Sequence, residues 1–272
     1  ANTTADMFNK DFSFQWQNPE TNKVVTDWKV FSDLFLSIPM AHQMSTQFTI
    51  LDGTKNKQML KVMRPYQVYA TKAVLSQLKQ ADFTLPINKL GYIWHTTGSG
   101  KTITSFKTAW LASRMPHVDK VVFVVDRIAL TKQTEENYKA YDPEGTIDVD
   151  GRQFDAVAGT ENTNVLKRKL NEKGNGIIVT SVQKLTKLIQ RKDFTLPKKN
   201  FVFIVDEAHR STGGDSFEDL QKVFKGAAWV GYTGTPMFDE VAGKNTTKTR
   251  EVFGNLLHAY TIREAIADKN VL

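Results

Sequence analysis

From about residue 59 onward, short apolar runs alternate with segments of helical periodicity. The apolar runs are mostly β-branched or aromatic, which predicts strands at Gly91 to His95, Val121 to Val125, Ile177 to Ser181, Phe201 to Asp206 and Ala228 to Tyr232. Around them, residues suited to one helix face recur every three to four positions, which predicts helices at Ala70/Ala73/Val74/Leu78/Ala81, Ile103/Phe106/Trp110 and Leu130/Thr134/Asn137/Tyr138/Tyr141. This alternation predicts an α/β fold, with a mostly parallel sheet, helices on both faces and ligands beyond the carboxyl ends of the strands.

The first 58 residues differ in character, because they are aromatic, irregular and interrupted by turn signals at Asn18-Pro19 and Asp52-Gly53. We therefore expect a smaller N-terminal segment, 1–58, followed by a main domain, 59–272. The chain begins Ala-Asn-Thr-Thr without a methionine and stops directly after a helical pattern. We interpret it as a fragment of a longer protein.

Composition narrows the class of protein. No apolar stretch approaches the roughly 18 residues that cross a bilayer, so we expect a cytoplasmic protein with no membrane partner. There are no cysteines, and the five histidines show no metal-ligand spacing. A net charge of +7 favours polyanionic partners such as nucleic acid.

The strand ending at His95 is followed by Thr96-Thr97-Gly98-Ser99-Gly100-Lys101-Thr102 and then by an amphipathic helix. Glycines at 98 and 100 let backbone N–H groups curl around phosphate oxygens, and the helix N-terminus adds its positive dipole. The pattern predicts a phosphate-binding loop for ATP, in which Lys101 reaches the β- and γ-phosphates and Thr102 holds Mg²⁺. His95 stands where the usual pattern has its first glycine.

The apolar strand Phe201 to Asp206 runs into a second carboxylate, Glu207, and then Ala208-His209. Asp206 is suited to the Mg²⁺ shell and Glu207 to polarising the attacking water as general base. His209 is a candidate for coupling this site to a polymer track. The interpretation requires that the tips of the two strands meet at one edge of the sheet, close enough to share one metal-bound triphosphate.

The Asp206 to His209 box, followed by Thr233-Gly234-Thr235-Pro236, resembles motifs II and III of superfamily 2 helicases and translocases, whose motor lobes are RecA-like. Upstream, Arg64-Pro65-Tyr66-Gln67 resembles their adenine-reading Q motif. By this resemblance Gln67 would pair with the adenine edge, Tyr66 would stack on its face, and Thr233, Gly234 and Thr235 would couple nucleotide state to the track.

The exact residues of these and other motifs narrow the resemblance further, to the motor subunit of type I restriction enzymes. The boxes that carry it are Trp94 to Thr102, Val125-Asp126-Arg127 with Leu130 and Gln133, Val179 to Leu185, Asp206 to Ser211, Gly231 to Pro236, Phe253-Gly254, Tyr260-Thr261-Ile262 and Glu264 to Asp268. The match spans roughly residues 59–272. It implies a prokaryotic enzyme that translocates duplex DNA with ATP, cleaves it, and works with methyltransferase and specificity subunits.

The same resemblance supplies candidate DNA contacts, which are Arg127, Thr131, Gln133, Thr180, Ser181 and Lys184. These residues follow strand ends or begin helices, where hydroxyls, amides and cations can grip backbone phosphates without reading bases. The run Lys167-Arg168-Lys169 is instead typical of a solvated helix face, and Phe106 and Trp110 have core spacing.

Other features limit the activity that we expect. In the superfamily 2 motors that this sequence resembles, a second motor lobe supplies arginine fingers to the γ-phosphate. The 272 residues include no second phosphate-loop pattern, so we expect ATP binding with little turnover from this chain alone. Asp27-Trp28-Lys29 fits a short nuclease pattern of the family, but it matches by chance in many chains.

Two alternatives to the type I subunit stay open. One is another superfamily 2 motor, such as a type III restriction, repair or RNA helicase. The other is an ATP-gated binding module without turnover, against which Glu207 argues because such a module needs no water-activating carboxylate.

Overall fold

The computed structural model describes residues 14–54, 58–125, 128–141, 146–147, 153–154, 157–206, 215–237 and 249–268. At its centre lies a seven-stranded sheet with the order β11-β3-β10-β9-β4-β8-β7, in which every neighbouring pair runs parallel. The strands are β3 (Asn88–His95), β4 (Lys120–Val125), β7 (Val157–Gly159), β8 (Ile177–Ser181), β9 (Phe201–Asp206), β10 (Ala228–Thr233) and β11 (Leu256–Tyr260). The predicted α/β fold is confirmed.

All five predicted strands form the middle of this sheet, and the two strands that the sequence did not predict, β7 and β11, lie at its edges. The central strands are buried on both faces, so their sequences read as continuous apolar runs. An edge strand is covered less completely. β11 begins at the exposed Leu256 and carries a histidine at its centre, which hides the strand pattern.

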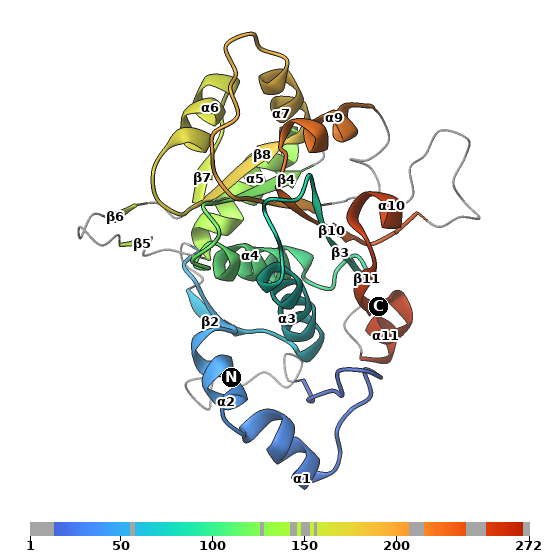
Figure 1. The fold of residues 1–272 in the computed structure, drawn as a ribbon. Helices are drawn as coiled ribbons and strands as arrows, with labels where there is room; N and C mark the ends of the chain where they lie inside the picture. Colours follow the sequence, from blue (N-terminus) through green and yellow to red (C-terminus); the bar gives the residue numbers. More distant parts are fainter. Residues whose placement is uncertain are drawn as a thin grey trace.

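Helices cover both faces of the sheet (Figure 1). One layer contains α3 (Pro65–Lys79), α4 (Lys101–Ala112) and α5 (Ile128–Ala140), and the other contains α6 (Thr163–Asn171), α7 (Val182–Ile189), α9 (Asp215–Val223) and α10 (Thr249–Phe253). Side chains along each strand alternate between two cores. In β4, Val121, Phe123 and Val125 pack on the α3–α5 side, whereas Val122 and Val124 pack on the α6–α10 side.

The N-terminal segment packs beneath the α3–α5 layer. It contains α1 (Trp28–Phe31), the π-helical turn η3 (Ser32–Leu36), α2 (Met40–Thr46) and the hairpin of β1 (Thr49–Asp52) with β2 (Met59–Val62). Its buried side chains join the same core as α3 and α4. The hairpin crosses residue 58, and a division of the chain there stays a prediction.

Three smaller elements complete the described ranges. The short strands β5 (Thr146–Ile147) and β6 (Gln153–Phe154) pair with each other, and α11 (Ile262–Ala267) follows β11. Within those ranges, no helix has the length and the apolar character that crossing a bilayer requires.

Candidate nucleotide-binding site

The loop between β3 and α4 has the backbone geometry that a phosphate cradle needs. Gly98 and Gly100 adopt positive φ angles of 83° and 79°, and Gly100 is the residue that precedes the first turn of α4. The buried Ser99 locks the loop, because its hydroxyl donates to the Thr96 carbonyl at 2.6 Å. Only glycine adopts such φ angles without a steric penalty. The predicted loop therefore forms at the tip of β3, with the N-terminus of α4 behind it.

Lys101 is the first residue of α4, and its side chain folds over the loop. Its Nζ donates to the carbonyl oxygens of His95 at 3.3 Å and of Thr96 at 3.5 Å. Gly234 lies against the same ammonium, since a Cβ on Gly234 would be 3.3 Å from Lys101 Nζ. The Trp94 indole also donates to the Gly234 carbonyl at 3.1 Å. The first residue after β10 thus lies next to the lysine.

Asp206, the last residue of β9, lies at the same edge of the sheet. β10 pairs with β3 on one side and β9 on the other, and Tyr232 is in register with both Ile93 and Asp206. Because all three strands are parallel, the tips of β3 and β9 are two strand spacings apart, roughly 10 Å. The predicted meeting of the two tips is confirmed.

Asp206 also lies on the face of the sheet that carries α4. Asp206 and Tyr232 are register partners on neighbouring strands, so their side chains point to the same face. Burial raises the pKa of Tyr232, and the negative charge of Asp206 adds to that rise. The Tyr232 hydroxyl in turn hydrogen bonds with Thr108 of α4 at 2.8 Å. Carboxylate and hydroxyl oxygens are the protein ligands that Mg²⁺ prefers. Asp206 and Thr102 therefore fit the predicted metal site, while Glu207 and His209 lie outside the described residues.

The residues of the predicted Q motif contact the loop from below. Gln67 Oε1 accepts from the Arg64 backbone N–H at 2.9 Å, and its Nε2 donates to the Ser99 carbonyl at 3.2 Å. The Tyr66 hydroxyl donates to the same carbonyl at 2.7 Å. A Cβ on Gly100 would be 2.7 Å from Gln67 Nε2. Gln67 thus supports the loop, and its adenine contact stays a prediction.

The prediction that Tyr66 stacks on adenine is wrong. Its ring is 2% exposed and lies flat against Tyr260 of β11, with ring centroids 3.7 Å apart and planes 4° apart. Burial raises the Tyr66 pKa to about 12, so the hydroxyl stays protonated and keeps its role as a donor. Burial of a large aromatic ring is favourable, and the ring of Tyr260 takes the stacking position that the prediction gives to adenine.

The sequence reasoning missed β11, which holds the loop from the other side. The Thr96 N–H donates to the Tyr260 carbonyl at 2.9 Å, and the Tyr260 hydroxyl donates to Asp268 at 2.7 Å. Next to this contact, His95 Nε2 hydrogen bonds with His258 Nδ1 at 3.1 Å. The only available signal was the short apolar run that ends at Tyr260.

Both histidines are neutral at physiological pH. Burial lowers the pKa of His258 to about 4. Burial also lowers the pKa of His95 well below its ordinary value, and the charges of His258 and Lys101 add to that effect. A neutral pair can share one proton in the hydrogen bond. His95, at the position of the usual first glycine, therefore ties the start of the loop to β11.

The predicted DNA contacts have mixed outcomes in the structure. Thr180 and Ser181 are fully buried, and the Ser181 hydroxyl accepts from the Lys184 N–H at 3.4 Å as the cap of α7. The Lys184 ammonium turns inward and donates to the Thr160 carbonyl. Buried hydroxyls cannot reach a polymer, so the contacts predicted for Thr180 and Ser181 are wrong, and in this structure Lys184 is also directed away from solvent.

The other predicted contacts are less constrained. Gln133 is exposed on α5, Thr131 lies in the same helix with its side chain undescribed, and Arg127 lies outside the described residues. Of the coupling residues, Thr233 is buried and its hydroxyl accepts from the Thr235 N–H at 3.1 Å. The roles of these residues stay predictions.

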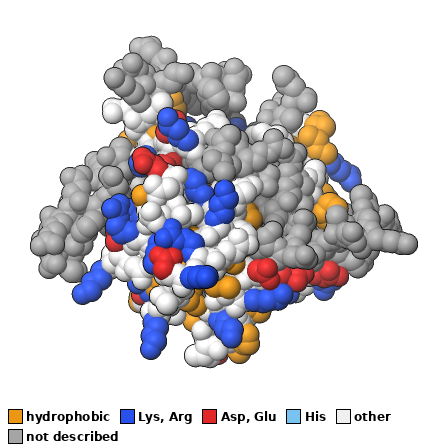
Figure 2. Space-filling view, turned by 90° about the horizontal axis from the view of Figure 1, so that it is seen from above, with side chains coloured by type: hydrophobic (Ala, Val, Ile, Leu, Met, Phe, Trp, Pro, Cys, Tyr) orange, Lys and Arg blue, Asp and Glu red, His pale blue; other side chains and the backbone are white. Residues whose placement is uncertain are grey.

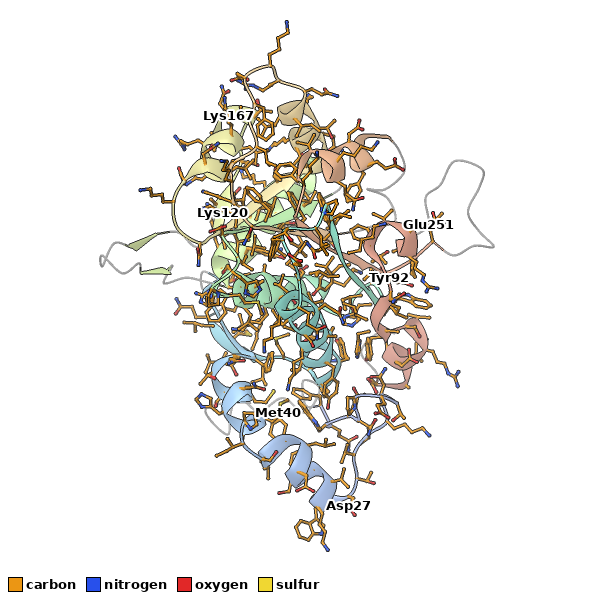
Figure 3. All side chains as sticks on the ribbon, in the orientation of Figure 1. Asp27, Met40, Tyr92, Lys120, Lys167 and Glu251 are labelled. Atoms are coloured by element: carbon orange, nitrogen blue, oxygen red, sulfur yellow. The ribbon has the colours of Figure 1, made fainter. Side chains whose placement is uncertain are left out.

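Two further features lie away from the strand tips. Asp27 caps α1, accepting from the Lys29 and Val30 N–H groups at 2.8 and 3.1 Å, so the short nuclease-like pattern begins a helix at the end of the molecule labelled in Figure 3. A cavity of about 540 Å³ is lined by Pro86 and Lys89, at the start of β3, and by residues of α9 and α10. It lies at the opposite end of β3 from the loop.

A parallel sheet with a glycine-rich phosphate loop at one strand tip and an acidic residue two strands away defines a RecA-like lobe. Residues 66–272 match the model of the SWI2/SNF2 ATPase family, so the chain belongs to that family. Use of a nucleotide follows from the class of the family. The predicted relationship to superfamily 2 motors is confirmed.

The curated relatives are endonuclease subunits of type I restriction enzymes. The SauMSSORF170P subunit of Staphylococcus aureus (strain MSSA476) is 38% identical over 97% of this chain, which spans 26% of that subunit. A Mycoplasma pneumoniae protein named as the C-terminal part of the MpnIIP endonuclease subunit is 38% identical over 77% of this chain and 100% of its own length. The chain spans about a quarter of the length of the Staphylococcus subunit. The predicted resemblance to type I restriction subunits is confirmed.

Solved structures agree on the fold. A nuclease-deletion mutant of the type ISP restriction-modification enzyme LlaGI, in complex with a DNA substrate mimic, has a TM-score of 0.53 and 20% identity, covering 77% of this chain and 21% of that one. The type ISP enzyme LlaBIII bound to DNA has a TM-score of 0.51 and 17% identity, covering 79% of this chain and 16% of that one. At these identities the likeness shows the RecA-like fold alone.

Proposed function

We propose that this chain is the nucleotide-binding lobe of a DNA-translocating ATPase, the motor of a type I restriction enzyme endonuclease subunit. The observation that supports this most is the arrangement of two strand tips at one edge of the sheet. Lys101 and Thr102 follow β3, Asp206 ends β9, and a single strand, β10, separates the two. Such an edge is where ligands bind in open α/β sheets.

Each residue has a defined task in binding Mg-ATP. Backbone N–H groups of Gly98 to Lys101 would surround the phosphates at the start of α4. The Lys101 ammonium would exchange its two carbonyl contacts for β- and γ-phosphate oxygens, which attract it more strongly because they carry charge. Thr102 and Asp206 would hold Mg²⁺, which neutralises charge on the transferring phosphoryl group. Glu207 would activate the attacking water.

The DNA and the partner subunits are inferred from the relatives. Type I restriction subunits and the LlaGI and LlaBIII complexes make duplex DNA the expected track. Methyltransferase and specificity subunits would complete the enzyme and select its target. A rival function is an ATP-gated binding module without turnover. Replacing Glu207→Gln in the full-length subunit separates the two, because a motor would keep ATP binding and lose hydrolysis.

The nucleotide site can be tested on the chain itself. Lys101→Ala removes the cation that would contact two phosphates, and a charge-assisted contact of this kind is worth about 1.5–3 kcal/mol. We expect the dissociation constant of a fluorescent ATP analogue to rise by roughly tenfold to a hundredfold. Lys79→Ala, at an exposed position on α3, is the matched control and should bind as the wild type does. Equal affinities for the two variants would refute the proposed site.

A further inference from the structure

The positive charge of the chain is concentrated in one segment. Residues 163–199 contain ten lysines and arginines but only two acids, a formal charge of +8, whereas the whole chain carries +7. The remaining residues are therefore close to neutral. An excess of one sign over 37 residues creates a local field that a mixed surface would not have.

This segment folds into the outer layer on one side of the sheet. It supplies α6, β8, α7 and the connection to β9, and α6 and α7 lie together at one end of the molecule (Figure 1). Figure 2 looks down on that end, where Lys and Arg side chains are spread over the centre and left and Asp and Glu are fewer. Lys167, labelled in Figure 3, marks the position of α6.

Some of these cations hold the layer together. The Arg191 guanidinium contacts Asp193 at 2.8 Å and the Thr163 hydroxyl at 3.1 Å, which joins the connection to the start of α6. Lys167 pairs with the same Asp193 at 2.9 Å. Lys199 donates to the last carbonyls of α6. These three cations therefore stabilise the layer, and other cations of the segment are exposed to solvent.

The outward cations form what we call the outer basic surface, which consists of Arg168, Lys173, Lys187, Lys192 and Lys198, all exposed. Arg168 pairs with Glu172 at 3.4 Å. Within the described part of the chain, no acid lies within ion-pair distance of Lys187, Lys192 or Lys198. On α6, where the sequence predicts a solvated face, Arg168 is exposed, and α6 packs against α7, which carries Lys187.

The geometry points to this outer basic surface as a binding surface for the phosphate backbone of duplex DNA, which rests on the proposed function. At the head of α7 the contacts expected from sequence are buried or turned inward, as Ser181 and Lys184 show. The exposed Lys187 on the same helix remains available. Contacts from flexible lysines to phosphates position a duplex without reading its bases, which suits a motor that moves along any sequence.

The composition of the surface favours DNA over an acidic protein. None of the large hydrophobic side chains exposed on the described chain lies between residues 163 and 199. Protein interfaces have an apolar, aromatic centre and are poor in lysine, whereas protein–DNA interfaces are polar and strongly positive. The outer basic surface has the second character.

The test compares two variants with the same change in charge. The outer variant is Lys187→Gln/Lys192→Gln/Lys198→Gln, and the control variant is Lys23→Gln/Lys29→Gln/Lys79→Gln, whose lysines are equally exposed elsewhere. Fluorescence anisotropy with a short labelled duplex should show at least ~10-fold weaker binding for the outer variant. The slope of log affinity against log salt should become shallower by up to ~2.7, about 0.9 for each lost phosphate contact.

Each outcome decides the inference. If the outer and control variants bind the duplex equally, or if the wild-type chain binds no duplex, the inference fails. If the outer variant keeps its DNA affinity and instead loses binding to polyglutamate, the surface serves an acidic protein and the inference fails as well. An ATP analogue is titrated into all the proteins in parallel. Normal nucleotide binding throughout means that such a failure leaves the proposed nucleotide site intact.

Discussion

Gly100 shows how one residue can be fixed by both its backbone angle and its surroundings. Its φ is +79°, and a Cβ would be 2.7 Å from Gln67 Nε2. Gly174 has a similar φ of +85° but has no heavy atom within 4 Å of such a Cβ. Substitution of Gly174 therefore tests only the free-energy cost of a side chain in the left-handed region. Substitution of Gly100 tests that cost together with the loss of contacts beneath the loop.

We expect Gly174→Ala to lower the free energy of unfolding by roughly 1–2 kcal/mol, the cost of a Cβ in the left-handed region. Gly100→Ala should cost about 1 kcal/mol more, because Gln67 must give up its hydrogen bond to the Ser99 carbonyl. It should also weaken binding of an ATP analogue, which Gly174→Ala should not. Urea denaturation and nucleotide titration measure both effects. Equal losses of stability and unchanged affinity would contradict this account of the loop.

Single residues were also where the sequence was least informative. Lys101 and Asp206 could be located because each follows an apolar strand at a recognisable spacing. Tyr66 and Ser181 belong to motifs as clear as those, yet both are buried by partners that are remote in sequence or by the helix that they cap. A motif specifies which residue types are present, whereas the direction of a side chain depends on tertiary neighbours that a pattern does not contain.

Among the elements, β11 connects the phosphate loop to the C-terminal part of the described chain. It provides the carbonyl that accepts from the Thr96 N–H, the ring beneath Tyr66 and the histidine that pairs with His95. The sequence predicted the five central strands because full burial makes them uniformly apolar. It could not predict β11 in the same way, because a half-covered edge strand admits polar residues such as His258.

The His95–His258 pair should make stability sensitive to acid. His258 has a pKa of about 4 when folded and 6.5 as its ordinary value, so the unfolded chain binds more protons between these pH values. The contribution of His258 to the free energy of unfolding is fully present above pH 6.5. It is lost as the pH drops toward 4, by on the order of 3 kcal/mol. His258→Leu should lower stability at neutral pH and flatten its decline in acid.

The matched control for that experiment is His42→Leu, since His42 is exposed on α2. Urea denaturation at several pH values between 4 and 8 gives the slope for each protein. The control should decline in acid as steeply as the wild type. If His258→Leu declines just as steeply, burial of this histidine is not a source of acid sensitivity.

At the scale of the whole molecule, charge and chemistry occupy different regions. The proposed nucleotide site lies at the carboxyl edge of the sheet, beside β3, β10 and β9. The excess positive charge lies on the outer layer, in residues 163–199. For the proposed motor, this separation would let one set of cations hold a polyanionic track without competition from a second polyanion, the triphosphate.

The crowding of positive charge on the outer layer should lower the stability of the folded chain, and added salt should reveal this effect. Like charges crowded on one layer repel one another in the folded chain, and dissolved ions screen that repulsion over a Debye length of about 10 Å at 0.1 M. We expect the melting temperature of the wild-type chain to rise as sodium chloride increases from low to moderate concentration. The outer variant Lys187→Gln/Lys192→Gln/Lys198→Gln should melt higher than the wild type at low salt and respond less to added salt.

The Lys23→Gln/Lys29→Gln/Lys79→Gln control removes the same charge from dispersed positions, so it should retain most of the wild-type salt response. Parallel salt responses for the two variants, measured by calorimetry, would mean that the outer layer is not under electrostatic strain.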